Sequence, residues 1–171
     1  QVEEVVMMGR YPHFDFNPTP KDIAICDAAI SKLDLAAFRA RNYMTLSGGE
    51  KQRVHFARVL AQVWEAPVNG GQRYLLLDEP LNNLDIKYQQ QFMQLAREWC
   101  RQGAVVICVL HDINLACQYA DQLYLLKEGE LVQSGSPREL VTAAMLEKVF
   151  DIRAEVWQHP GTGHPLVGFN G

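Results

Sequence analysis

Two adjacent carboxylates, Asp78 and Glu79, directly follow a short apolar run at residues 74–77. Such a run without polar alternation predicts a strand that is covered on both faces of a parallel sheet. Because ligands of open α/β sheets bind at the carboxyl ends of the strands, the two acids would face a binding site. One acid could hold a hydrated Mg²⁺ while the other orients or deprotonates an attacking water. An isolated Asp-Glu pair is more often a solvated strand end, so the neighbouring motifs must decide.

A second candidate is the Gly-rich motif LSGGE, which contains Ser47, Gly48, Gly49 and Glu50. The spacing of its serine and glutamate is that of a capping box, so a helix is predicted to begin here and to run to about residue 64. The two glycines leave backbone N–H groups accessible at the positive end of that helix, which suits an anion such as a phosphate. Taken alone, most S-G-G-E matches are only Gly-rich turns that begin a helix.

A third candidate is His111, which follows a second apolar run at residues 104–110. Between the two runs, residues 86–101 have helical periodicity, and Asp85 stands where an N-cap is expected. A strand–helix–strand unit makes its two strands parallel and brings their carboxyl ends to one edge. The topology therefore predicts His111 beside the two acids, where it could bind a phosphate or hold a water, although a lone histidine after a strand is usually structural.

The first 45 residues are expected to be helical throughout. A short helix is predicted near residues 1–10, a longer one from a Thr19 cap to about residue 30, and a further short one at 34–41. Neither a strand nor a sustained heptad repeat is expected here. In the helix after LSGGE, Arg53 is expected on a solvated face.

The chain after residue 111 predicts smaller elements. We expect a helix at 112–119, a β-hairpin at 122–133 and a helix opened by a second capping box at 136–150. A last strand is predicted at 154–157, and the Gly- and Pro-rich tail at 160–171 is expected to be mobile.

Composition excludes several classes. With 16 Lys and Arg against 20 Asp and Glu, the net charge is −4, which argues against general nucleic-acid binding. The longest clean apolar run is far shorter than the ~20 residues of a membrane helix, and nothing at the amino end resembles a signal peptide. Any membrane association is expected to go through a partner. The four cysteines form no C-x-x-C pair, which favours reduced thiols.

Taken together and in this order, the motifs resemble those of the ATP-binding subunits of ABC transporters. LSGGE resembles the family signature, YLLLDEP the Walker B strand with its catalytic glutamate, LNNLD the D-loop, and His111 the switch histidine. The resemblance implies an α/β fold with a P-loop NTPase-like parallel sheet flanked by helices, in part, over residues 46–171. Residues 1–45 would form the small helical subdomain that docks on membrane subunits.

The resemblance also implies site roles, with ATP and Mg²⁺ as cofactors. Asp78 would hold Mg²⁺ through water, Glu79 would polarise the hydrolytic water and His111 would hold the γ-phosphate. Two subunits would face each other head to tail with two ATP molecules between them. The signature residues would contact the γ-phosphate bound by the partner, and Asp85 would couple the two sites.

Finer features resemble importers of iron chelates, haem and cobalamin. The segments EEVV and MGRYPH carry this resemblance. The stretch LNNLDIKYQQQ and the insertion at residues 64–73 are most similar to hemin importers, with ferric siderophore or cobalamin import as alternatives. The implied partners are a second copy, two transmembrane permease subunits and a periplasmic substrate-binding protein. The implied location is peripheral, at the cytoplasmic face of the bacterial inner membrane.

One departure from the family pattern is that no G-x-x-x-x-G-K-[ST] phosphate-binding loop occurs in the sequence. We therefore expect this chain to be the carboxyl-terminal part of a longer protein, and to bind ATP poorly and hydrolyse it negligibly by itself. Two other classes share some features. One is a DNA-repair or chromosome-organising ATPase of the SMC type, which is disfavoured by the lack of heptads before the signature. The other is a non-catalytic module that only pairs with a partner.

Overall fold

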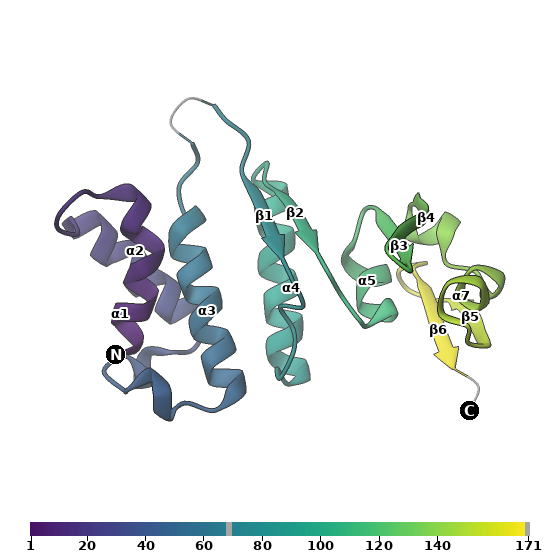
Figure 1. Cartoon of the computed structure of the whole chain (residues 1–171), viewed down its shortest axis with the longest axis horizontal. Coiled ribbons are helices and arrows are strands. Elements are labelled where there is room, and N and C mark those ends of the chain that lie inside the picture. The colour runs from purple at the N-terminus through teal and green to yellow at the C-terminus, as the bar shows by residue number, and fades with distance from the viewer. Residues whose placement is uncertain (68–69, 170–171) are drawn as a thin grey trace. The chain divides into compact units, whose positions relative to one another are not determined.

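The structure is a computed structural model that describes residues 1–67 and 70–169. The chain forms two compact units, Gln1–Val109 and Leu110–Gly171, which we describe separately (Figure 1). Among the described residues, no helix combines the length and the apolar character needed to cross a membrane.

Helices form the first part of unit one, as expected. In chain order they are α1 (Val2–Met7), the 3₁₀ helix η1 (Met8–His13), α2 (Pro20–Lys32), the 3₁₀ turns η2 (Ala36–Phe38) and η3 (Tyr43–Thr45), and α3 (Gly48–Val63). The Thr19 side chain accepts from the Asp22 N–H, and the Asp22 carboxylate accepts from the Thr19 N–H. This capping box confirms the predicted start of α2. The helix expected at 34–41 is reduced to η2. Asp34 instead lies in the turn that ends α2, where it has a left-handed φ of 54° and its N–H donates to the Ser31 carbonyl.

The helix α3 is the centre of this packing. The helices α1 and α2 and the 3₁₀ helix η1 all pack against it, and its residues Val54, Ala57, Leu60 and Ala61 are buried. The predicted subdomain boundary at residues 45/46 stays a prediction, since the compact units divide at 109/110.

The burial of Arg53 on α3 corrects the sequence interpretation, because this side chain is only 7% exposed. Its guanidinium donates to the carbonyls of Leu33 and Asp34 at 3.1 and 3.3 Å and lies 4.1 Å from the centre of the Tyr88 ring. Hydrogen bonds and an aromatic face thus compensate the cost of burying the charge.

A strand–helix–strand unit completes unit one and confirms the predicted topology. Strand β1 (Tyr74–Leu77) pairs in parallel with β2 (Val105–Cys108), and α4 (Ile86–Arg101) connects them. The expectation that both faces of β1 are covered is wrong for this chain: Leu75 is buried, but Tyr74 is 61% and Leu76 74% exposed. The helix α4 packs on this two-stranded sheet, and no described segment covers the face that carries Leu76.

Unit two contains more short elements than the sequence predicts. They are α5 (Ile113–Tyr119), β3 (Leu123–Lys127), β4 (Glu130–Gly135), α6 (Pro137–Leu140), α7 (Ala143–Phe150), β5 (Ala154–Gln158) and β6 (Pro165–Phe169). The antiparallel β3–β4 hairpin is confirmed. The single helix expected at 136–150 is two helices, because Val141 is extended and Thr142 caps α7.

The tail of unit two is ordered where mobility was expected. Strand β6 pairs antiparallel with β5, from Ala154 opposite Phe169 to Gln158 opposite Pro165. The side chain of Asn114 accepts from the Val167 N–H at 2.7 Å and donates to the Val167 carbonyl at 3.0 Å. These contacts order a segment that its Gly- and Pro-rich composition predicts to be mobile. Residues 170–171 of the predicted tail lie outside the described residues.

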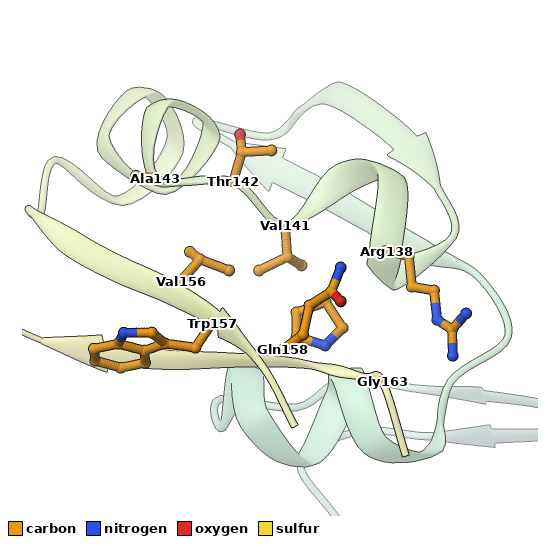
Figure 2. A pocket seen from close by; sticks show the side chains of 9 residues that line it. Arg138, Val141, Thr142, Ala143, Val156, Trp157, Gln158 and Gly163 are labelled. Atoms are coloured by element: carbon orange, nitrogen blue, oxygen red, sulfur yellow. The ribbon is translucent and has the colours of Figure 1, made fainter. Parts of the chain in front are cut away.

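A cavity of about 350 Å³ lies in unit two, between α7, β5 and the residues that follow α6 (Figure 2). Its lining includes Arg138, Val141, Val156, Trp157 and Gln158, of which only Arg138 belongs to a motif singled out from the sequence, the second capping box.

The four cysteines are free thiols, of which Cys26 and Cys117 are buried. Burial raises the pKa of Cys26, Cys108 and Cys117 to about 11, so these thiols stay protonated at neutral pH.

Candidate functional site

The signature motif forms the start of α3 as a complete capping box. The Ser47 hydroxyl accepts from the Glu50 N–H at 3.3 Å, and the Glu50 carboxylate accepts from the Ser47 N–H at 2.7 Å. This hydrogen bond from the Ser47 backbone holds the pKa of Glu50 below its usual value. The carboxylate of Glu50 therefore serves the helix start, while Gly48 and Gly49 form the first turn beside it.

The two acids stand at the turn that follows β1. Asp78 is exposed and Glu79 is half-buried. Glu79 has a left-handed backbone with φ of 44°, and the side-chain amide of Asn82 donates to its Oε2 at 2.5 Å. The Asn82 N–H also donates to the Glu79 carbonyl at 3.3 Å. The strand thus ends in a tight turn that holds the second acid at both its backbone and its carboxylate.

The signature motif and this turn lie against each other within unit one. The side-chain amide of Gln52 on α3 donates to the Pro80 carbonyl at 2.9 Å. A Cβ atom added to Gly49 would lie 2.8 Å from the Asn83 carbonyl oxygen, so only glycine fits this approach. The helix start with its accessible N–H groups and the pair of acids therefore lie close together in one unit, a proximity that the sequence analysis did not predict. Sequence reasoning missed the contacts of Gln52 and Asn82. The only signal for Asn82 was the pair of asparagines in a polar turn, and Gln52 on α3 gave none.

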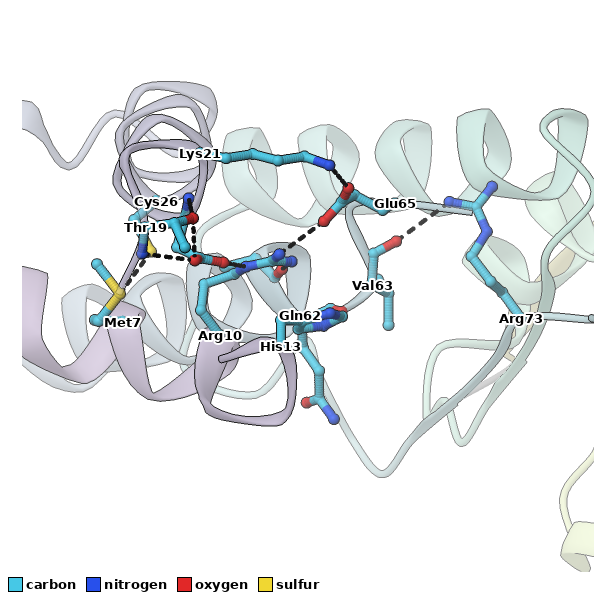
Figure 3. A network of polar contacts seen from close by, with 12 residues as sticks. Met7, Arg10, His13, Thr19, Lys21, Cys26, Gln62, Val63, Glu65 and Arg73 are labelled. Carbon is cyan, nitrogen blue, oxygen red and sulfur yellow. Dashed lines mark hydrogen bonds and ion pairs between the residues drawn. The ribbon is translucent and has the colours of Figure 1, made fainter. Parts of the chain in front are cut away.

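The opposite end of α3 is fixed by a buried arginine, Arg10 (Figure 3). Its guanidinium donates to Asp22 Oδ1 at 2.8 Å, to the Ala61 carbonyl at 2.8 Å and to Glu65 Oε2 at 2.7 Å. Lys21 also forms an ion pair with Glu65. Burial alone would raise the pKa of Asp22, but hydrogen bonds from Thr19 and Arg10 together with the arginine charge lower it to about 2.

No protein-family model matches the chain. Its relatives include the hemin import ATP-binding proteins of Gloeobacter violaceus (48% identical, aligned over 98% of this chain and 60% of the relative) and Pseudomonas entomophila (44%, 97% and 63%). The fold is similar to an inward-facing ABC transporter of metal-chelate type, with a TM-score of 0.79 and 26% identity over 99% of this chain and 65% of the other. It is also similar to a dimeric bacterial ABC transporter cassette, with a TM-score of 0.67 and 27% identity over 80% and 56%.

Over nearly its whole length, the chain is similar to the ATP-binding subunits of ABC transporters. The P-loop NTPase-like α/β fold class inferred from the sequence is that of these cassettes. The chain spans about three fifths of the length of the curated ABC relatives it matches.

The turn at residues 81–85, which resembles a D-loop, ends in the predicted helix cap. The Asp85 side chain accepts from the Tyr88 N–H at 3.0 Å, and α4 begins at the next residue. Gln89 donates back to the carbonyl of Leu84 at 3.1 Å, which closes the loop against the helix. The carboxylate of Asp85 therefore positions α4, and its role in coupling two ATP sites stays a prediction.

The switch histidine of the ABC pattern, His111, belongs to unit two, just before α5. Asp112, the next residue, caps α5 by accepting from the N–H groups of Asn114 and Leu115. The predicted placement of His111 beside Asp78 and Glu79 stays a prediction, because the two acids belong to unit one.

The carboxylate of Asp78 fits a hydrated Mg²⁺. Within the described residues there is no group of three or more His, Cys, Asp or Glu side chains that could enclose a metal ion. Mg²⁺ on a nucleotide usually takes one or two carboxylates, phosphate oxygens and several waters, so a dedicated cage is not needed. The exposed carboxylate of Asp78, at the carboxyl end of β1, provides a suitable oxygen ligand.

Proposed function

We propose that this chain supplies the signature motif, the catalytic acids and the switch histidine of the ATP-binding subunit of a hemin importer. The observation that carries the proposal is that relatives named hemin import ATP-binding protein are 41–48% identical over 96–98% of the chain. Their names favour transport over an SMC-type role in DNA repair. In the whole subunit, ATP hydrolysis at a dimer interface would drive import.

The geometry of α3 supports a role for the signature motif at that interface. In a head-to-tail pair of subunits, Ser47, Gly48 and Gly49 of one copy face the γ-phosphate of ATP bound by the partner. A 16-residue helix starts at this point, and the N-terminus of a helix favours an anion through its dipole and its N–H groups. The dimeric cassette among the similar structures supports the pairing of two copies.

The turn after β1 supports the proposed chemistry. Asp78 would hold Mg²⁺ through water, and the ion would supply charge neutralisation at the phosphate oxygens. Glu79 accepts a hydrogen bond from the attacking water and orients it for an in-line displacement. His111 donates a hydrogen bond to the γ-phosphate. Asp85 couples this site to the second one across the dimer.

The proposed partners are a second ATP-binding subunit, two transmembrane permease subunits and a periplasmic substrate-binding protein. The subunit is peripheral at the cytoplasmic face of the bacterial inner membrane, where residues 1–45 dock on the permease. The dimer closes on ATP and opens after hydrolysis, because ATP shifts the equilibrium between the open and the closed conformation.

Metal-chelate import, with a ferric siderophore as substrate, is the second candidate. It is favoured by the similarity of the fold to a metal-chelate-type transporter over 99% of this chain. The two candidates share the site and differ only in the substrate that the membrane and binding-protein subunits select.

A chimera tests the proposal. In it, this chain replaces the 167 matched residues of the Gloeobacter violaceus relative. We expect the chimera to restore growth on hemin as the sole iron source in cells that lack their hemin import ATP-binding subunit. A Glu79→Gln chimera is the matched control and should fail while still accumulating as a closed, ATP-loaded dimer. Growth on a ferric siderophore but not on hemin, in cells lacking the corresponding subunit, would favour the second candidate.

A further inference from the structure

The carboxylate of Glu79 is held by a side chain to which the proposed chemistry gives no role. The amide of Asn82 donates to Glu79 Oε2 at 2.5 Å, and the N–H of the same residue donates to the Glu79 carbonyl at 3.3 Å. A hydrogen bond to an ionised acceptor is about twice as strong as one between neutral groups. Asn82 therefore fixes both the direction of the carboxylate and the turn beneath it.

The backbone of this turn needs such support. Glu79 has a φ of 44° and Asn83 a φ of 62°. The left-handed region is tolerated by asparagine and is unfavourable for a long side chain such as glutamate. A backbone is kept in this unfavourable region only where the contacts around it hold it there, and such residues cluster at functional sites.

The helix α3 supplies these neighbouring contacts. Gln52 donates to the Pro80 carbonyl at 2.9 Å, immediately after Glu79 in the chain. Gly49 allows the Asn83 carbonyl to come within 2.8 Å of the point where a Cβ atom would stand. The turn is thus anchored on the element that the signature motif begins.

We propose that Asn82 is a positioning residue for Glu79 and that Gln52 anchors the turn that carries them both. This inference rests on the proposed role of Glu79 in orienting the hydrolytic water. Asn82 aligns the carboxylate before ATP arrives. Gln52 prevents the turn from moving away from α3 when the phosphates bind.

The first test compares two substitutions of Asn82 in the complete chimera. Asn82→Ala removes the donor, and we expect kcat for ATP hydrolysis to fall about 10- to 100-fold with KM for ATP changed less than about twofold. Asn82→Asp keeps the size and the turn preference but places a negative charge against Glu79, and we expect at least the same loss. If Asn82 serves only the turn, Asn82→Asp retains the full rate, and that result overturns the proposal.

The second test asks whether Asn82 acts through Glu79. In a Glu79→Gln background, Asn82→Ala should cause no further loss in single-turnover hydrolysis, because the effects of coupled residues are not additive. Gln52→Ala should lower kcat several-fold. Gln94→Glu, a change from amide to carboxylate on an exposed position of α4, is the matched charge control and should leave kcat unchanged. An equal additional loss in the Glu79→Gln background would contradict positioning.

A measurement independent of catalysis separates this inference from the proposed function. In the NMR spectrum of this chain, the Asn82 side-chain amide should resonate downfield and exchange slowly. Glu79→Ala should remove both properties, while Gln94→Glu should leave them. An Asn82 amide that is insensitive to Glu79→Ala overturns the inference whether or not the wild-type chimera hydrolyses ATP. An inactive wild-type chimera with the expected amide signals would contradict only the proposed function.

Discussion

Gly48 and Gly49 stand side by side at the start of α3, yet their surroundings differ. The nearest atom to a Cβ at Gly48 would be the Asn83 Cβ at 3.6 Å, an ordinary contact distance. At Gly49 the nearest atom would be the Asn83 carbonyl oxygen at 2.8 Å, which belongs to the backbone and cannot rotate away. The second glycine is therefore required by packing within one subunit, apart from any contact with a phosphate.

This difference leads to a prediction for the two alanine substitutions. Gly49→Ala should lower the free energy of unfolding of this chain by about 1–3 kcal/mol, because the added methyl group forces the turn away from α3. Gly48→Ala is the matched control and should change it by less than about 1 kcal/mol, since alanine favours the helix and meets no close atom. Urea titration followed by circular dichroism measures both, and equal stabilities would contradict the close approach.

At the scale of the element, α3 is held at both of its ends. Gln52 and Gly49 attach its first turns to the turn that carries Glu79. Arg10 binds the Ala61 carbonyl near its other end and pairs with Asp22 and Glu65. A helix fixed at both ends keeps its N-terminus in one place, which is what a phosphate-binding end requires.

The buried arginine allows a second prediction. Arg10→Met should lower the free energy of unfolding by about 3–5 kcal/mol, because it leaves the buried Asp22 carboxylate and the Ala61 carbonyl without their donor. Arg39 also pairs with two acids, Glu3 and Asp27, but its side chain is 44% exposed against 2% for Arg10. Arg39→Met should therefore cost at most about 1 kcal/mol. Thermal and urea unfolding of the two variants test this ranking, and similar losses would argue against it.

Most of the helices and strands could be predicted from the sequence, but strand β6 could not. The starts of α2 and α3 were predictable because Thr19 and Ser47 satisfy backbone groups within three residues of themselves. The parallel pairing of β1 and β2 was predictable from the chirality of the crossover. Strand β6 was missed, since its order comes from β5 and Asn114, which is distant in the sequence.

For the site, the residue types and their spacing were sufficient to locate the helix start and the acids. The contacts of Asn82 and Gln52 were missed because side-chain directions in an irregular turn depend on a left-handed Glu79, which no local pattern signals. Arg53 was placed in solvent for a similar reason, since the carbonyls and the ring that receive it come from other segments.

At the scale of the whole molecule, the proposed roles of the signature and the acids depend on a phosphate-binding loop that this sequence does not contain. In the family, that loop and its lysine supply most of the affinity for the triphosphate. Among the groups that this chain can offer a nucleotide are the start of α3 and the exposed carboxylate of Asp78. A single helix end typically contributes only about 1 kcal/mol toward an anion, which is far below what ATP binding requires.

We therefore predict that this chain alone binds Mg·ATP at least about 100-fold more weakly than the chimera that restores the full length of the Gloeobacter violaceus relative. Isothermal titration calorimetry of the two proteins at equal salt and magnesium measures the ratio. The signature variant Ser47→Arg, which places a bulky side chain at the dimer interface, should leave the chimera's affinity nearly unchanged, because the signature faces the ATP of the partner. Stoichiometric binding by this chain alone would mean that it contains a phosphate site other than the one described, and the roles of Asp78 and Glu79 would then have to be assigned around that site.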